Sequence, residues 1–345
     1  MITELEEKIA TYSKNTTETI DQVFLNLTRE YLGLLGQMYG TLSNGEQLTW
    51  AQLSKYGRLK KFMKLFENKT TIAYKAILKE IRKSNRSVFL EQRIYDVYDN
   101  KIQSAIEMGF TIPSHSTLNK LLENPIDKMK LPKVLGQHRS EIVREIQKTI
   151  TQGVVKGEPY EKTAQEISKK VGISANKARK VVRTENGRSR SLASLETDKQ
   201  LKKMGVKFDK YWLATLDTRT RVSHATLDGR KADEHGYFHS RGHKAKGPRL
   251  FGVASEDINC RCTVIRSLPK FRTARNYEDK NYQKKLKTRI DELKKKENLT
   301  NSEAEKRAKK EVVAPNKKVD FVPYNEWRTT FLKDNKELYN ENIEK

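Results

Sequence analysis

The sequence has few of the features that mark secreted or membrane proteins. Only two of its 345 residues are cysteines, Cys260 and Cys262, too few and too close together for a disulfide framework. No apolar run is long enough to span a membrane. Residues 1–6 are acidic and polar, unlike a secretory signal. We therefore expect a chain made in a reducing cytosol, with no membrane partner.

Negative charge is also scarce. The chain has 69 Lys and Arg against 44 Asp and Glu, a formal net charge of +25. An excess of this size cannot be neutralised within the protein and indicates a polyanionic partner, with double-stranded DNA as the leading candidate. The alternative is a lysine-rich soluble protein whose charge has no particular partner.

The apolar pattern predicts an α+β protein that is mostly helical. Apolar residues make up 36% of the chain, which is lean for one large globule but suits helices with one apolar face and solvated tails. Ile20, Phe24 and Leu27, for example, recur at the spacing of one buried helical face. We expect four regions: a helical N-terminal region at 1–112, a helical connector at 113–204, a small loop-rich α+β module at 205–268 with strands near 208–213 and 262–268, and a basic helical or extended C-terminal extension at 269–345.

The connector has a pattern typical of a helix-turn-helix. A glycine corner at residues 172–174 would separate one short helix from a basic second helix. The outward cations of that second helix, which would contact DNA phosphates, are Lys177, Arg179, Lys180 and Arg183. Because any short helical hairpin needs the same pattern, a sequence-reading regulator is the weaker alternative to non-specific phosphate contact.

Candidate metal ligands gather between residues 217 and 262. Zinc takes four donors in a tetrahedron, and two thiolates with an imidazole are suitable ligands. Cys260 and Cys262 would point to the same side of a strand, with His224 as their partner and Asp217, Asp228 or a later histidine as the fourth ligand. Cys-x-Cys is tighter than the usual zinc spacing, and the thiols could equally be small buried hydrophobes. A structural zinc ion is therefore the one cofactor that the sequence suggests.

The same segment supports an enzymatic hypothesis, a metal-dependent nuclease. The residue types that could activate water beside a divalent ion are His224, Asp228, His235, His239 and Asn259. No acid–histidine pairing at a recognisable spacing supports this role. The simpler interpretation is that charge-assisted hydrogen bonds brace the loops through Asp217, Arg219, Arg221 and Asp228.

Four separated elements resemble the phage Mu F-like head morphogenesis (minor head protein) family of tailed bacteriophages. They are R-T-E-N at 183–186, W-x4-D-x-R-T-R-x-x-H at 212–224, L-D-G at 227–229 and N-C-R-C at 259–262. The resemblance covers about residues 140–268. The family pattern falls on Arg183, Thr184, Glu185, Trp212, Asp217, Arg219, Thr220, Arg221, His224, Asp228, Gly229, Asn259, Cys260 and Cys262. One departure is Gly247-Pro248, where family members often have proline before glycine.

The resemblance implies a minor capsid protein in the capsid interior near the portal vertex, present in the host cytoplasm during assembly. Its implied partners are the portal protein, other head or scaffold proteins, and packaged DNA, whose ejection it would influence. No catalytic role transfers with the motif. We therefore expect a non-enzymatic protein of head morphogenesis, with the nuclease and the helix-turn-helix regulator as alternatives.

Overall fold

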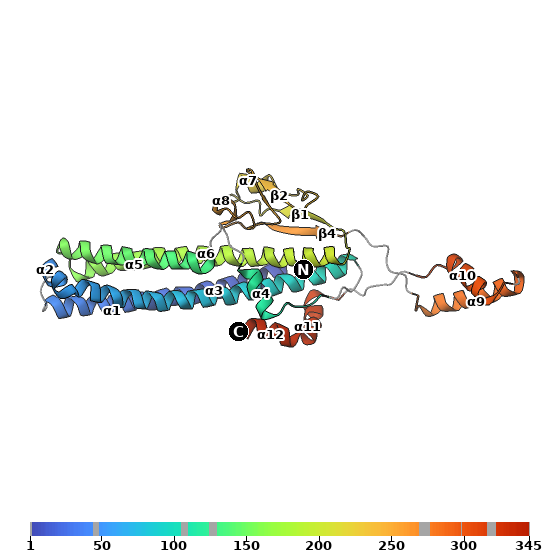
Figure 1. Ribbon diagram of the computed structural model, residues 1–345, viewed down its shortest axis with the longest axis horizontal. Helices are drawn as coiled ribbons and strands as arrows, with labels where there is room; N and C mark the ends of the chain where they lie inside the picture. Colours follow the sequence, from blue (N-terminus) through green and yellow to red (C-terminus); the bar gives the residue numbers. More distant parts are fainter. Residues whose placement is uncertain are drawn as a thin grey trace.

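The protein is built on an elongated bundle of long helices (Figure 1). The computed structural model describes residues 2–43, 48–104, 110–123, 130–268, 277–297, 299–315 and 322–344. The bundle helices are α1 (Ile2–Ser43), α3 (Arg58–Ser104), α5 (Leu131–Val155) and α6 (Tyr160–Lys203), with the short α2 (Trp50–Ser54), a 3-10 turn (Lys55–Gly57) and α4 (His115–Leu122) between them. The structure confirms a mostly helical α+β fold.

One apolar core runs along the bundle and takes residues from α1, α3, α5 and α6. The predicted stripe of α1 is buried, since Ile20, Phe24 and Leu27 are each at most 3% exposed. Inside the core, the Tyr31 hydroxyl lies 2.5 Å from Thr70 Oγ1, so the buried phenol keeps a hydrogen-bond partner. This core draws on both regions expected at 1–112 and 113–204.

The helix-turn-helix prediction is wrong. Helix α6 continues through residues 172–174 without a corner. Gly172 is exposed, and a glycine there costs about 1 kcal/mol relative to alanine, too little to break a packed helix. On the opposite face, Val171, Ala175 and Ala178 continue the buried stripe into the core. Long-range packing therefore overrides the local turn signal.

The module after α6 consists of two small antiparallel sheets and two helical turns. Strand β1 (Asp209–Leu213) pairs with β4 (Thr263–Ser267), with Tyr211 opposite Ile265, which confirms both predicted strands. The other elements are β2 (Phe238–Ser240), β3 (His243–Ala245), α7 (Val222–Ala225) and α8 (Ala254–Asp257). Trp212 is fully buried at the centre of the module core.

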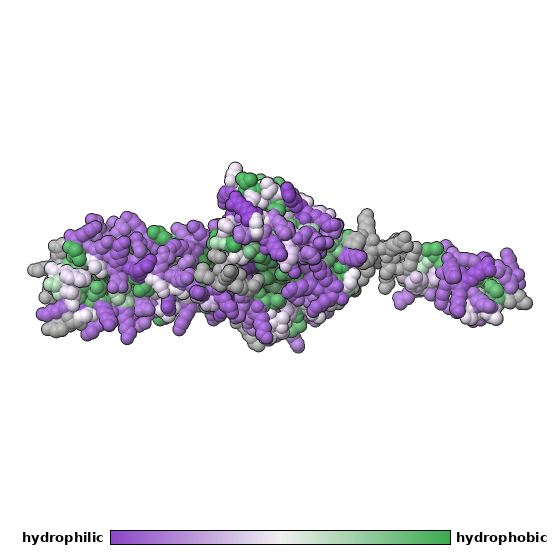
Figure 2. Space-filling view, turned by 45° about the horizontal axis from the view of Figure 1, so that its top comes forward, coloured by the Kyte–Doolittle hydropathy of each residue, from purple (hydrophilic) through white to green (hydrophobic). Residues whose placement is uncertain are grey.

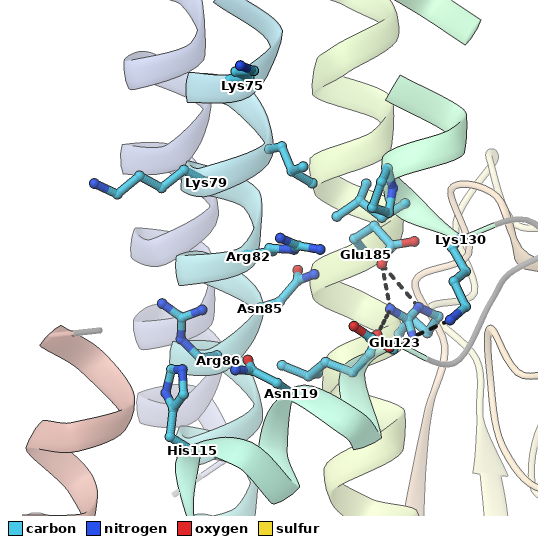
Figure 3. A pocket seen from close by; sticks show the side chains of 15 residues that line it. Lys75, Lys79, Arg82, Asn85, Arg86, His115, Asn119, Glu123, Lys130 and Glu185 are labelled. Atoms are coloured by element: carbon cyan, nitrogen blue, oxygen red, sulfur yellow. Dashed lines mark hydrogen bonds and ion pairs between the residues drawn. The ribbon is translucent and has the colours of Figure 1, made fainter. Parts of the chain in front are cut away.

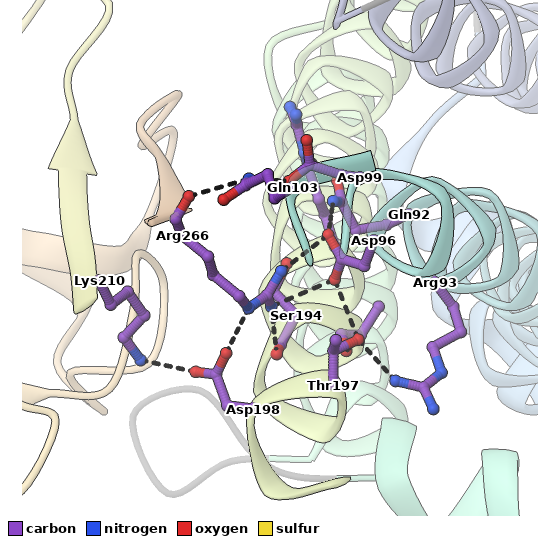
Figure 4. A network of polar contacts seen from close by, with 12 residues as sticks. Gln92, Arg93, Asp96, Asp99, Gln103, Ser194, Thr197, Asp198, Lys210 and Arg266 are labelled. Carbon is purple, nitrogen blue, oxygen red and sulfur yellow. Dashed lines mark hydrogen bonds and ion pairs between the residues drawn. The ribbon is translucent and has the colours of Figure 1, made fainter. Parts of the chain in front are cut away.

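A buried network of charges joins this module to the bundle (Figure 4). Arg266 of β4 reaches between two helices: its Nε donates to Asp198 Oδ1 of α6 at 2.6 Å, and its Nη1 lies 3.0 Å from Asp96 Oδ1 of α3. Lys210 of β1 donates to the other oxygen of Asp198 at 2.8 Å. All four side chains are at most 7% exposed. Burial alone would raise the pKa of Asp198, but Arg266 and Lys210 hold it below its usual value.

The C-terminal extension forms two helical pairs. Helices α9 (Lys280–Glu297) and α10 (Asn301–Glu311) make a hairpin with its own small core, which lies apart from the bundle in Figure 1. Helices α11 (Tyr324–Asp334) and α12 (Lys336–Glu344) instead return to α3 and α4, across the bundle from the module. There Trp327 packs on Tyr98, with ring centroids 5.3 Å apart.

Hydrophilic side chains cover most of the bundle and hairpin faces seen in Figure 2. Within the described ranges, no helix combines the length and the apolar character needed to cross a membrane.

Candidate functional site

Three of the four predicted metal ligands meet in the core of the module. The ligand atoms of His224, Cys260 and Cys262 all lie within 4.8 Å of one another. Cys262 Sγ is 3.5 Å from His224 Nδ1, and each of the three residues is at most 3% exposed. His224 comes from α7, whereas both cysteines precede β4 rather than lying on it.

Arg249 fixes the loop that carries the two cysteines. Its guanidinium donates to the carbonyl oxygens of Cys260 (2.7 Å) and Cys262 (3.2 Å), and also to that of Gly187 on α6 (3.1 Å). Gly187 has to be glycine for this approach, because a Cβ there would lie 2.1 Å from Arg249 Nε. The thiol loop is thus tied directly to the bundle.

Glu256 of α8 holds the imidazole from its other side. Its Oε2 lies 2.9 Å from His224 Nε2 and accepts a hydrogen bond from Ser240 Oγ at 3.0 Å. A proton on Nε2 would satisfy this contact and leave Nδ1 free to face the sulfurs. Glu256 is 0% exposed, and although burial opposes it, these partners keep the pKa of its carboxyl below the usual value. No residue spacing in the sequence connects Glu256 with His224, so sequence reasoning missed it.

The two sulfurs are electrostatically unequal. A hydrogen bond from Cys262 lowers the pKa of the Cys260 thiol to about 4, with help from Arg249 against the effect of burial. The same pairing and burial raise the pKa of Cys262 far above its usual value. The surroundings therefore favour the thiolate at Cys260 over the thiolate at Cys262.

The structure does not bring Asp217 into this group. Its carboxylate pairs with Arg261 and accepts from the Arg219 backbone N–H at 3.0 Å, and the Arg261 contact holds its pKa well below the usual range. Asp228, the other carboxylate considered, accepts from the Ala214 N–H at 2.7 Å. Both carboxylates brace loops, as the simpler interpretation expected.

The histidines of the nuclease hypothesis are also separated. His235 is exposed, and His239 is 62% exposed and lies 2.7 Å from Asp233. His224, in contrast, is buried among the thiols. Among the described residues the three histidines form no common site.

The four sequence elements of the resemblance come together where α6 carries the module. Thr184 Oγ1 accepts a hydrogen bond from the Asn259 backbone N–H at 3.2 Å, which joins the first element to the last. Gly229, with φ 69°, donates to the Trp212 carbonyl at 2.9 Å and joins the third element to the second. Arg221 donates to the carbonyl of Ile258.

The four cations predicted to contact DNA differ in their surroundings. Lys177 pairs with Glu141 of α5 at 2.5 Å, and Arg179 pairs with Asp21 of α1 at 2.8 Å. Lys180 and Arg183 are exposed, and their side chains have no ion pair with any described residue. Internal carboxylates thus neutralise half of the predicted set.

A second basic surface lies on α3 and was not predicted. A cavity of about 420 Å³ opens between α3, α4, the start of α5 and α6 (Figure 3). Its charged lining consists of two glutamates, Glu123 and Glu185, and six Lys or Arg residues, Lys75, Lys79, Arg82, Arg86, Lys130 and Arg188. Glu185 pairs with Arg188 and Glu123 with Lys130, which leaves the four α3 cations without a carboxylate among the described residues.

Three buried polar atoms in the cavity lining also have no hydrogen-bond partner among the described residues: Asn85 Oδ1, His115 Nδ1 and Arg188 Nη1. Burial, together with the charge of Arg82, lowers the pKa of Arg86. The cavity is therefore under-neutralised and suited to an anion. The regular spacing of cations at 75, 79, 82 and 86 on one helical face was the sequence signal for it.

Comparison with known proteins gives three findings. Residues 144–265 match the family described as phage Mu protein F like protein. The chain is 31% identical over 263 residues to Minor head protein GP7 of Bacillus phage SPP1, covering 76% of this chain and 85% of that protein. It is also 37% identical over 176 residues to NAD(+)--arginine ADP-ribosyltransferase EFV of Enterococcus faecalis, covering 51% of this chain but 36% of that protein. No solved structure matches.

Proposed function

This chain belongs to the phage Mu F-like minor head protein family and acts in head morphogenesis, and we propose that it binds the portal protein and contacts packaged double-stranded DNA without sequence preference. Its place is the virion head. Proximity to the portal vertex and an influence on DNA ejection are parts of the proposal that rest on the family likeness.

The observation that carries the DNA contact is the set of cations without carboxylate partners. The exposed α3 cations run from Lys75 to Arg82, seven positions apart, which is about 10 Å at 1.5 Å per residue. Arg86 is buried and donates to the carbonyl of Asn342, so it does not belong to this surface. Duplex DNA carries one negative charge per ~1.7 Å of axis, so such a stripe can face several phosphates. Phosphate contacts carry no direct sequence information, and the continuous α6 offers no separate recognition helix.

The two unpaired cations of α6 support the same contact. Lys180 lines a second cavity, of about 350 Å³, between α5, α6 and α8. The two cavities share Leu131 and Glu185 in their linings, so they are neighbours on the bundle. Lys180 and Arg183 thus extend the proposed DNA surface beyond α3.

Binding to the portal or another head protein is supported by the hairpin of α9 and α10. The hairpin buries its own apolar residues, among them Tyr282, Leu286 and Leu293, and stands away from the bundle (Figure 1). It can therefore meet a partner without disturbing the bundle core. The test is co-sedimentation of the phage portal protein with the full chain and with a chain lacking residues 277–315. Equal binding by both chains would mean that the hairpin does not make the contact.

We propose further that the protein is not an enzyme. His224 and Cys262 contact one another as a catalytic pair would, but both are at most 3% exposed, so a substrate could not reach them. The likeness to an ADP-ribosyltransferase covers about a third of that protein. DNA that stays uncut with divalent ions, and no transfer from NAD⁺ to arginine-containing proteins, are the expected results.

The central experiment is a DNA titration over a series of salt concentrations with three double variants of the full chain. The α3 pair is Lys79→Ala/Arg82→Ala, the unpaired α6 pair is Lys180→Ala/Arg183→Ala, and the control is Lys177→Ala/Arg179→Ala. All three remove two positive charges. Each lost phosphate contact should reduce the slope of log K against log salt by about 1, so the first two variants should lose up to about 2.

The control variant should bind nearly as the native chain does, because its two cations already face carboxylates. Equal weakening of DNA binding by all three variants would mean that binding depends only on the net charge of the protein, and would contradict the proposed surface. A clear preference among unrelated duplexes would contradict non-specific binding.

A further inference from the structure

We propose that His224, Cys260 and Cys262 bind a zinc ion inside the module, and that Glu256 is the positioning residue that orients the imidazole. This inference is independent of the DNA and portal contacts. It replaces the ligand set expected from the sequence, in which Asp217 was a member.

The distance between Cys262 Sγ and His224 Nδ1 is the one expected for two ligands of the same zinc ion. Zinc bonds of about 2.3 Å to sulfur and 2.0–2.1 Å to nitrogen at a tetrahedral angle place the two ligand atoms about 3.6 Å apart. Cys262 Sγ and His224 Nδ1 are 3.5 Å apart, and Cys260 Sγ lies within 4.8 Å of both. Two thiolates and an imidazole are also the donors that zinc prefers over the hard cations.

Glu256 supplies the outer contact that zinc-bound histidines usually have. A metal-ligating histidine donates its other N–H to a carboxylate or carbonyl, which fixes the ring orientation and the tautomer. Glu256 Oε2 stands 2.9 Å from Nε2, on the side of the ring away from Cys262. Ser223 and Ser240 donate to the same oxygen at 3.3 and 3.0 Å and hold the carboxylate in place.

The loop that carries the two sulfurs is also held in place by contacts within the protein. Arg249 binds the carbonyls of both Cys260 and Cys262, and Asn259 takes the left-handed conformation (φ 57°) that turns the chain toward them. Among the described residues no fourth His, Cys, Asp or Glu joins the group, so a water molecule would complete the tetrahedron.

A zinc ion would give this module stability that its size does not supply. Its apolar core contains nine buried residues, three of which are small alanines, around Trp212. The two sheets have two strands each, and isolated two-stranded sheets are marginal in water. Metal binding in such a module contributes directly to its folding free energy.

The test measures metal content of the full chain, purified under reducing conditions without metal-affinity steps. We expect one zinc per chain, lost in Cys260→Ser/Cys262→Ser and retained in His239→Ala, the control at an exposed histidine. Glu256→Gln should weaken zinc binding about 10- to 100-fold in a chelator competition, because it alters the outer contact and keeps all three ligands.

Cobalt substitution of the native chain gives a second measurement that does not depend on the folding of any variant. Two thiolates on the ion should give a thiolate-to-cobalt charge-transfer absorption. Absence of both zinc and this absorption overturns the proposal, as does zinc retained by the double serine variant. An intact mass showing a Cys260–Cys262 disulfide in the chain purified without reductant, with no metal present, would also overturn it. None of these outcomes bears on the DNA titration, so the two proposals fail separately.

Discussion

Arg266→Met should uncouple the module from the bundle. In the native protein the Arg266 guanidinium serves two buried carboxylates, Asp198 at 2.6 Å and Asp96 at 3.0 Å. Methionine keeps most of the apolar stem but removes the charge. Asp198 retains Lys210 at 2.8 Å, whereas Asp96 has no other ion pair within the described residues. The variant therefore leaves the buried Asp96 carboxylate without an ion pair, although Arg93 still reaches it through the Thr197 hydroxyl.

Removing one partner of a buried ion pair costs about 3–5 kcal/mol, because the remaining charge stays desolvated. We expect a loss of that size in the free energy of unfolding, measured by urea titration. Far-UV circular dichroism would follow the helices, and tryptophan fluorescence would include the signal of Trp212 inside the module. Asp96→Asn added to Arg266→Met should recover part of the loss, since a neutral amide is less costly to bury than an unpaired carboxylate.

The control is Lys231→Met, which breaks an ion pair of the same module at its surface. Lys231 and Asp209 lie 2.8 Å apart and both are about half exposed, so solvent screens the pair and this change should cost far less stability than Arg266→Met. If Arg266→Met loses no more stability than Lys231→Met, the buried network does not hold the module in place and the reasoning fails.

Three further predictions concern backbone space, pH and chain boundaries. Gly187→Ala should destabilise the protein by about 1–3 kcal/mol in thermal or urea unfolding, because the new Cβ would displace the buried Arg249 side chain. Gly172→Ala has open space around the new Cβ and should stabilise the protein by about 0.5–1 kcal/mol. Equal effects of the two substitutions would contradict this account. The folded-state pKa of Asp198 is lowered, so its ionised carboxyl stabilises the fold above the ordinary pKa of 3.8, and this stabilisation is lost as the pH falls through the folded-state pKa. The free energies of unfolding of the native protein and Asp198→Asn should therefore converge at low pH. A difference that stays constant with pH would refute this prediction. A fragment of residues 144–265 should aggregate or stay unfolded by circular dichroism, and a monomeric helical fragment would contradict the packing argument.

Much of the fold was predictable because helices and strands leave periodic patterns. The spacing of Ile20, Phe24 and Leu27 identified the buried face of α1, and the apolar runs near residues 208–213 and 262–268 identified the strands that pair. Residue chemistry likewise selected His224 and the two cysteines as a possible metal group, and the structure brings them together.

The wrong prediction and the contacts that were not predicted all involve residues that are distant in the sequence. The corner expected at residues 172–174 disappears because the flanking apolar residues pack on other helices. The ion pair between Lys177 and Glu141 was missed because the two residues are 36 positions apart and lie on different helices. Glu256 is 32 residues from the histidine it contacts, and no local pattern records that distance.

The segment that matches the family is not a self-contained structural unit. It begins in α5 and ends in β4, so it holds one helical pair and the module, while α1 and α3 lie outside it. Yet Ile146, Ile167 and Val182 of that pair belong to the core that α1 and α3 complete. Asp96 of α3 also supplies one of the two carboxylates that bind Arg266. The module is therefore positioned by helices outside the matched segment, and the α3 cations proposed to meet DNA lie on one of those same helices.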